Sequence, residues 1–220
     1  MRTLTLTRAI TLLGIASLSI FLPACSASSQ GLSSRKFDNL PAAKSSPATA
    51  PTFNLDLSVD AAYAAIPHRR TAMSFAASNM PDQDKRFLEV AFHVIDQAIR
   101  LRVTAYQRFS RNAVGDSQSL LDMDRLVDYL QNTEAPASLS SYQARLLQAL
   151  SDQRAFFEEW QTQGQQFQHG SPQTIATHPK VQSASNALKD AYGILMETYP
   201  SEGAHNKAAF FDYHCALDFL

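Results

Sequence analysis

The chain has 220 residues and a mass of 24.3 kDa, a length that suits one packed domain. Apolar residues make up 45% and charged residues 18%, which is typical of globular proteins and excludes disordered, collagen-like and disulfide-scaffold classes. Lys and Arg number 19 against 20 Asp and Glu, so the formal charge of −1 argues against a nucleic-acid partner.

The first 25 residues have the pattern of an export signal. Arg2 and Arg8 flank a short polar stretch, and Ala9–Phe21 is an apolar run without a charge. A transmembrane helix needs about 20 apolar residues, so this shorter run favours a signal peptide. The run ends in Leu22-Pro23-Ala24-Cys25, which resembles the lipobox of bacterial lipoproteins.

The resemblance implies that Cys25 is lipidated and becomes the first residue of the mature protein. In that family the cysteine thiol is diacylated, the signal peptide is cut before it, and the new amino group is acylated. Several acyl chains together anchor a protein stably. Ser26 stands where an Asp retains enterobacterial lipoproteins in the inner membrane, so the resemblance implies the periplasmic face of the outer membrane. The alternative is cleavage after Ala27, which would release an ordinary secreted protein.

Residues 26–52 are rich in Ser, Ala and Pro, and we expect a flexible tether with an end-to-end distance of roughly 30 Å. Removal of residues 1–25 takes away two arginines and no acid, so the mature charge becomes −3. Cys215 is then the only cysteine besides the lipidated one, and we expect no internal disulfide. A single helical domain is expected over residues 53–220.

Prolines that mark helix boundaries and apolar residues at helical spacing predict an all-α fold, an antiparallel bundle of about five or six helices. The alternating segment 52–57 has no second strand with which to pair. The expected helices are residues 82–111 after Pro81, 120–130, 138–160 after Pro136, 181–199 after Pro179, and 206–220.

Each expected helix has a recognisable apolar face. In the first helix the opposite face carries His93 with Arg86, Glu89, Asp96 and Arg100, and we interpret it as a solvated charged face rather than a metal site. The acids of the second helix are expected to point outward. The last helix is apolar on nearly every side and is therefore expected to be buried. The apolar face of the first helix comprises Phe87, Leu88, Ala91, Val94, Ile95, Ala98, Ile99, Tyr106 and Phe109, and the outward acids are Asp122, Asp124 and Asp128.

Familiar catalytic and cofactor motifs are absent from the sequence. It has no Cys-x-x-Cys-His, no zincin motif, no nucleophile elbow and no phosphate-binding glycine loop. A di-iron site uses Glu-x-x-His on two helices, a pair of motifs that the sequence lacks, and Glu89 and His93 are four positions apart rather than three. No cofactor, metal site or catalytic set is therefore assigned. Noncovalent haem on His68 or His214 is kept as an alternative, with Met73, Met80, Met123 or Met196 as the second ligand.

Two features suggest an internal polar cluster. His68, Arg69 and Arg70 bring three basic side chains together, and Arg102 falls in the middle of an apolar face, where a cation needs a partner. The last helix offers carboxylates, and we expect Arg102 to pair with Asp218 as first choice and Asp212 as second. The cluster would either set helix register or line a site for an anionic ligand. Its candidate members are His68, Arg69, Arg70, Arg102, Asp212, His214 and Asp218.

These observations favour a lipid-anchored, periplasm-facing lipoprotein whose helical domain is a binding or assembly module. Its expected partners are the membrane, through the N-terminal lipid, and an unidentified protein or small anionic ligand. The alternative is a bundle that binds haem, a metal or another small ligand and has a redox or sensing role. An enzyme is the least favoured class, because no nucleophile, base and orienting group can be assembled.

Overall fold

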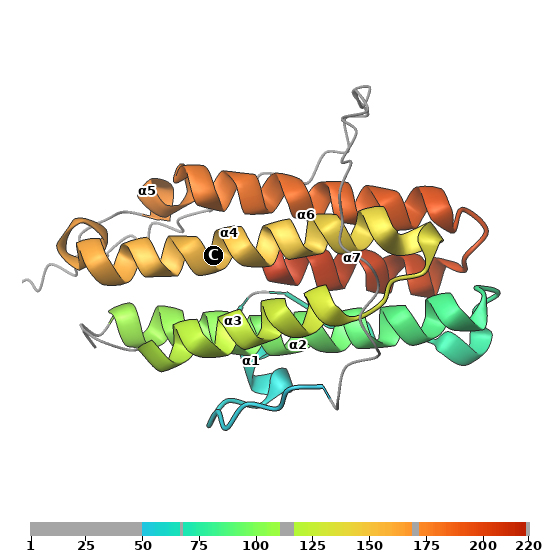
Figure 1. Cartoon of the computed structure of the whole chain (residues 1–220), viewed down its shortest axis with the longest axis horizontal. Helices are drawn as coiled ribbons and strands as arrows, with labels where there is room; N and C mark the ends of the chain where they lie inside the picture. Colours follow the sequence, from blue (N-terminus) through green and yellow to red (C-terminus); the bar gives the residue numbers. More distant parts are fainter. Residues whose placement is uncertain (1–49, 67, 111–116, 169–171, 219–220) are drawn as a thin grey trace, which may run out of the picture. The chain divides into compact units, whose positions relative to one another are not determined.

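The computed structural model describes residues 50–66, 68–110, 117–168 and 172–218 (Figure 1). These residues form an all-α fold, with seven α-helices and two short 3-10 turns, and the described part contains no strand. The all-α prediction is therefore confirmed. The expected signal peptide, Cys25 and nearly all of the expected tether lie outside the described residues.

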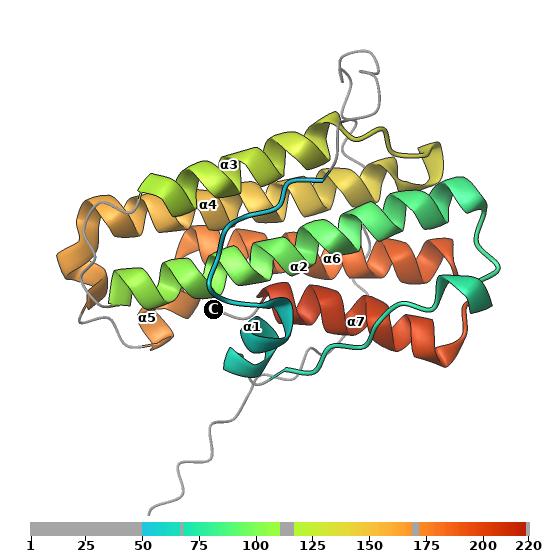
Figure 2. The same cartoon turned by 90° about the horizontal axis from the view of Figure 1, so that it is seen from below.

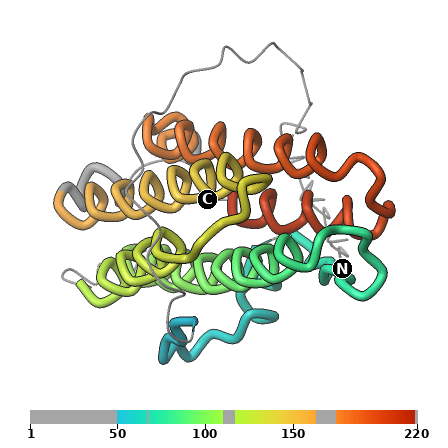
Figure 3. The backbone as a smooth tube through the Cα atoms, turned by 45° about the vertical axis from the view of Figure 1, so that its right-hand side comes forward, coloured from blue at the N-terminus to red at the C-terminus, as the bar shows by residue number. Residues whose placement is uncertain are grey.

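Five long helices, α2, α3, α4, α6 and α7, lie side by side with their axes nearly parallel (Figures 1, 2 and 3). The most extensive helix–helix contact joins α4 and α6. The short helices α1 and α5 bring the number above the expected five or six. The helices are α1 (Val59–Ala65), α2 (Asp82–Ser110), α3 (Ser117–Asn132), α4 (Ser140–Gln168), α5 (Pro172–Ala176), α6 (Pro179–Thr198) and α7 (Ala204–Asp218), with 3-10 turns at Phe75–Ala77 and Ala137–Leu139.

Local sequence explains where the helices begin. Pro81 precedes α2, whose first turn contains the acids Asp82 and Asp84, as the positive end of a helix dipole favours. Pro179 is the first residue of α6, and Nδ1 of His178 accepts a hydrogen bond from the backbone N–H of Lys180 at 3.2 Å. Both starting points agree with the sequence prediction.

The apolar faces predicted for the helices form the core. Tyr142 and Phe157 of α4 and Phe210 of α7 are fully buried, and most of α7 is buried as expected. Tyr106 differs from the prediction, because 43% of its surface is exposed. Its ring lies about one turn before the end of α2 and packs edge-on against Trp160, with ring centroids 5.7 Å apart, while the rest of the ring faces solvent.

The face of α2 that carries His93 is not a solvated face along its whole length. Arg86 and Glu89 are exposed as expected, but Asp96 is buried. The reason is that residues 53–66 fold back across this face (Figure 2). Arg100 donates hydrogen bonds to the carbonyl oxygens of Leu57 at 2.6 Å and Leu55 at 3.3 Å. The alternating segment that sequence could not pair as a strand is thus an extended cover over α2.

A second correction concerns α3. Asp122 was expected to point outward, but it is buried. Its carboxylate is satisfied within the helix, because Gln118 and Arg125 donate hydrogen bonds to its Oδ1 at 2.8 and 3.0 Å. Asp128 is exposed and Asp124 is half-buried beside Arg154, so outward orientation holds for these two. In the described part of the chain, no helix is both long and apolar enough to cross a membrane.

Candidate functional site

We call residues 68–80, which lead from the region of α1 into α2, the strap. The strap runs beside α7 for much of its length (Figure 2). Its first residues contact Asp212 of α7, a side chain that is only 2% exposed. Asp212 accepts hydrogen bonds from Nε of Arg69 at 2.9 Å and from the hydroxyl of Thr71, and Nε2 of His68 lies 3.7 Å from its other oxygen. Two other residues of the predicted cluster, His68 and Arg69, therefore meet at Asp212.

Arg70 turns to the other side and contacts Asp96 of α2. The contact is bidentate, with Nη2 donating to Oδ2 at 2.6 Å and Nε donating to Oδ1 at 3.2 Å. The hydroxyl of Tyr63 also donates to Asp96, at 3.2 Å. The hydrogen bond to Asp96 raises the pKa of Arg70, and burial raises the pKa of Tyr63 well above its usual range. Successive side chains of an extended segment point to opposite sides, which is why two adjacent arginines reach two different helices.

Arg102 is buried, as its position in the apolar stripe predicted, with 2% of its surface exposed. It makes no direct ion pair with the expected Asp218, although the charge of Asp218 acts to raise the pKa of Arg102. The guanidinium donates to the carbonyl oxygens of Leu217 and Ala216, the latter at 2.8 Å, in the last turn of α7. Among the described residues, no carboxylate lies within ion-pair distance of it. Burial lowers the pKa of Arg102 to about 10, so the side chain stays a cation at neutral pH.

The reason for the difference lies in the main chain. The last carbonyl groups of a helix have no partner within the helix and carry its negative dipole end, so a cation is stabilised there. Nε2 of Gln153 donates to the same Leu217 oxygen at 2.8 Å, so two side chains from α2 and α4 cap α7. Asp218 accepts a hydrogen bond from the hydroxyl of Ser185 at 3.0 Å instead, and burial raises its pKa.

His214 stands apart from all of these contacts. Its Nδ1 lies 2.6 Å from the carbonyl oxygen of Phe210, and burial lowers its pKa to about 4, so the ring is neutral at pH 7. The ring packs against Tyr142 and Phe92, with centroid distances of 5.5 and 6.5 Å. Both Nε2 of His214 and the hydroxyl of Tyr142 are buried without a hydrogen-bond partner.

The seven predicted residues thus do not form one site. His68, Arg69 and Asp212 meet, and Arg70 joins Asp96. Arg102 and Asp218 interact electrostatically but have different hydrogen-bond partners, and His214 lies among aromatic rings. Sequence reasoning missed Asp96 as a buried partner, because nothing in its helical position showed that another segment would cover it.

A second polar cluster, which the sequence did not reveal, forms hydrogen bonds with the later part of the strap. Glu202 accepts hydrogen bonds from the hydroxyl of Ser78 at 2.6 Å, the backbone N–H of Asn79 at 3.1 Å and the amide of Asn206 at 2.6 Å. Burial by itself raises the pKa of Glu202, but these hydrogen bonds outweigh it and leave the pKa below its usual value. Asn206 also bonds the main chain of Ser74 in both directions, accepting from its N–H at 3.0 Å and donating to its carbonyl at 3.3 Å.

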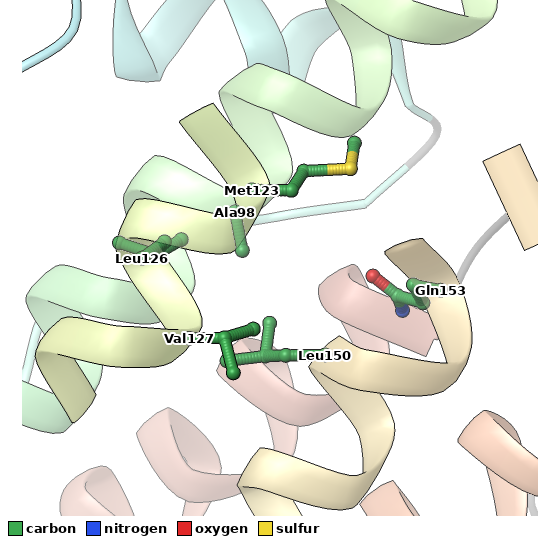
Figure 4. Close-up of a pocket in the computed structure, with 6 residues that line it drawn as sticks. All are labelled: Ala98, Met123, Leu126, Val127, Leu150 and Gln153. Carbon is green, nitrogen blue, oxygen red and sulfur yellow. The ribbon is translucent and has the colours of Figure 1, made fainter. Parts of the chain in front are cut away.

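A small apolar hollow lies between α2, α3 and α4 (Figure 4). Its lining contains no titratable side chain, so it offers shape without acid–base chemistry. Met80 and Met123, two of the methionines considered as haem ligands, are buried in the hydrophobic core. Within the described ranges, no group of three or more His, Cys, Asp or Glu side chains could hold a metal ion. The hollow is lined by Ala98, Met123, Leu126, Val127, Leu150 and Gln153.

The chain was also compared with known proteins. No protein-family model, no curated protein and no solved structure matches it.

Proposed function

We propose that the chain is a lipid-anchored protein of the bacterial envelope whose helical bundle is a binding or assembly module facing the periplasm. The observation that carries the proposal is Leu22-Pro23-Ala24-Cys25 at the end of an uncharged apolar run. Residues 26–52 would then be the tether. The first buried residue of the described part, Phe53, follows directly after that segment, so a tether of this length ends where packing begins.

The contacts of the candidate cluster support a protein partner over a small anion. An anion at Arg70 would have to displace Asp96, which accepts two hydrogen bonds from the guanidinium, and an anion at Arg69 would lie close to the negative charge of Asp212. Arg102 is enclosed and engaged with the end of α7. The cationic side chains that suggested an anion site therefore have partners within the fold. We infer that a partner protein would bind to the outer surface of the helical bundle.

The anchor is tested by labelling bacterial cells that express the full chain with a clickable fatty acid. We expect the wild type to be labelled and Cys25→Ser to lose the label, because the thiol is the acylated atom in lipoproteins. Cys215→Ser is the matched control and keeps the label, since Cys215 is a half-buried residue of α7. Equal labelling of wild type and Cys25→Ser would overturn the proposal.

Fractionation of the same cells tests the location. We expect the wild type with the outer membrane and Ser26→Asp with the inner membrane, as the retention rule of enterobacterial lipoproteins requires. A soluble periplasmic or secreted chain beginning at Ser28, measured by mass spectrometry, would instead support cleavage after Ala27 and contradict the anchor.

A further inference from the structure

Two polar side chains in the core, one on α4 and one on α7, have no hydrogen-bond partner among the described residues. They are the hydroxyl of Tyr142 and Nε2 of His214, and these residues are 0% and 3% exposed. Their rings are neighbours, with centroids 5.5 Å apart and planes at 71°. Folded proteins satisfy nearly all buried polar atoms with protein groups or ordered water, because an unsatisfied one is costly. Two such atoms on neighbouring rings therefore point to a small molecule bound between them.

The hydrogen-bond roles of the two atoms follow from their surroundings. Nδ1 of His214 lies 2.6 Å from the carbonyl oxygen of Phe210, and a carbonyl oxygen can only accept, so Nδ1 carries the proton. Burial lowers the pKa of His214 to about 4, so the ring is neutral at pH 7 and its Nε2 is an acceptor. Burial raises the pKa of the Tyr142 hydroxyl well above its usual range, so this hydroxyl keeps its proton and can donate. The pair thus offers one donor and one acceptor.

The surroundings of the two atoms exclude an ion. His214 also packs against the rings of Phe92 and Tyr192, with centroids 6.5 Å away in both cases. Its pKa responds to burial and to the Phe210 carbonyl, and to no charged side chain of the described residues. An ion held here would lose its hydration without gaining an opposite charge, which is far more costly than burying a neutral molecule. The bound molecule is therefore neutral.

The same roles limit the kind and size of the molecule. It has to accept from the Tyr142 hydroxyl and donate to Nε2 of His214, and between neighbouring rings it spans one hydrogen bond on each side. Water has this size, is both donor and acceptor, and is held in protein interiors by about two to four polar partners. A larger molecule would have to push aside rings of the close-packed core, such as Phe92.

We propose that Tyr142 of α4 and His214 of α7 form the binding site of one internal water molecule, which accepts a hydrogen bond from the Tyr142 hydroxyl and donates one to Nε2 of His214. The water joins the two helices inside the core. The site lies within the bundle and goes beyond the proposed function, because it depends neither on the lipid nor on a partner protein at the outer surface.

The site is tested by counting long-lived internal waters of the full chain in detergent, by magnetic relaxation dispersion of the water oxygen nucleus. We expect Tyr142→Phe to lose one long-lived water relative to the wild type, because phenylalanine keeps the ring and removes one of the two partners of the water. Tyr129→Phe removes the hydroxyl of a half-buried tyrosine of α3 and is the matched control. It should keep the number of the wild type.

Nuclear magnetic resonance of the wild type tests the site without a substitution at Tyr142. With isotope-labelled histidine, His214 should carry its proton on Nδ1, and the carbon-bound protons of its ring should show a nuclear Overhauser contact with water. The signals of His214 are those that disappear in His214→Leu.

Three outcomes would overturn the proposal. The first is an equal number of long-lived waters in the wild type and in Tyr142→Phe, with folding of the variant verified by circular dichroism. The second is a ring of His214 that contacts the hydroxyl proton of Tyr142 and not water, because the two side chains would then be bonded directly. The third is a His214 ring protonated on Nε2, which could not accept the hydrogen bond. The last two outcomes decide the matter even where Tyr142→Phe fails to fold.

Discussion

Arg102 gives the sharpest test of the fold, because its burial was predicted and its partner was not. In Arg102→Met the apolar stem is kept and the charged donors are removed, so the change in stability reports electrostatics and hydrogen bonding rather than a cavity. The variant leaves the carbonyl of Ala216 without its donor, whereas the carbonyl of Leu217 keeps the hydrogen bond from Gln153.

The magnitude follows from these contacts. A buried acceptor left without a donor costs about 1–3 kcal/mol, and loss of a favourable cation at a partly buried helix C-terminus adds up to about 2 kcal/mol. Methionine has no charge to desolvate, so the substitution also removes the cost of burying the guanidinium, which favours stability. We therefore expect the free energy of unfolding to fall by about 2–3 kcal/mol, measured by urea denaturation with the midpoint and slope fitted separately.

A matched control and a double-mutant cycle separate capping from an ion pair. Arg86→Met changes an exposed arginine of the same helix and should alter the free energy of unfolding by no more than about 0.5 kcal/mol. Coupling of Arg102→Met with Gln153→Met should be about 1 kcal/mol, because both donors share the Leu217 oxygen, whereas coupling with Asp218→Asn should be smaller, because Asp218 acts on Arg102 only without a direct hydrogen bond. A loss below about 1 kcal/mol for Arg102→Met, or strong coupling with Asp218, would refute the capping argument.

Three further predictions concern stability. Burial holds the pKa of His214 at about 4, against 6.5 for a free histidine. The contribution of the neutral ring to the free energy of unfolding is therefore complete above pH 6.5 and is lost as the pH falls toward 4, because only the unfolded chain takes up the proton in that range. The wild type should therefore lose up to about 3 kcal/mol more than His214→Leu between pH 7 and 4 in urea titrations, and parallel curves would contradict the assignment. Tyr199→Phe, which removes the hydroxyl that donates to buried Asp84 at 2.7 Å, should lower the free energy of unfolding by about 1–3 kcal/mol, with exposed Tyr106→Phe near zero as its control. Residues 53–220 alone should keep their helical circular dichroism in chelator and reductant, and cooperative loss of helix on adding chelator would reveal a structural metal.

Much of the helical layout could be predicted from the sequence because helix signals are local. Pro81 and Pro179 set φ for a first turn, and apolar residues three and four apart lie on one side of a helix whatever packs against it. The same local geometry places Arg102 inside an apolar stripe, which is why its burial was predicted without any knowledge of the neighbouring helices.

The functional contacts were decided by the tertiary structure. Asp96 was expected in solvent and is buried, because residues 53–66 and Arg70 fold back over its helix, and the distance between them along the chain leaves no periodic signal. Arg102 was expected to find an acid and found the carbonyl groups at the end of α7, which every residue type possesses and which no sequence position marks. A sequence determines which side chains need partners, because burial follows helical periodicity. The partners themselves depend on which segments and main-chain groups the fold brings within hydrogen-bond distance.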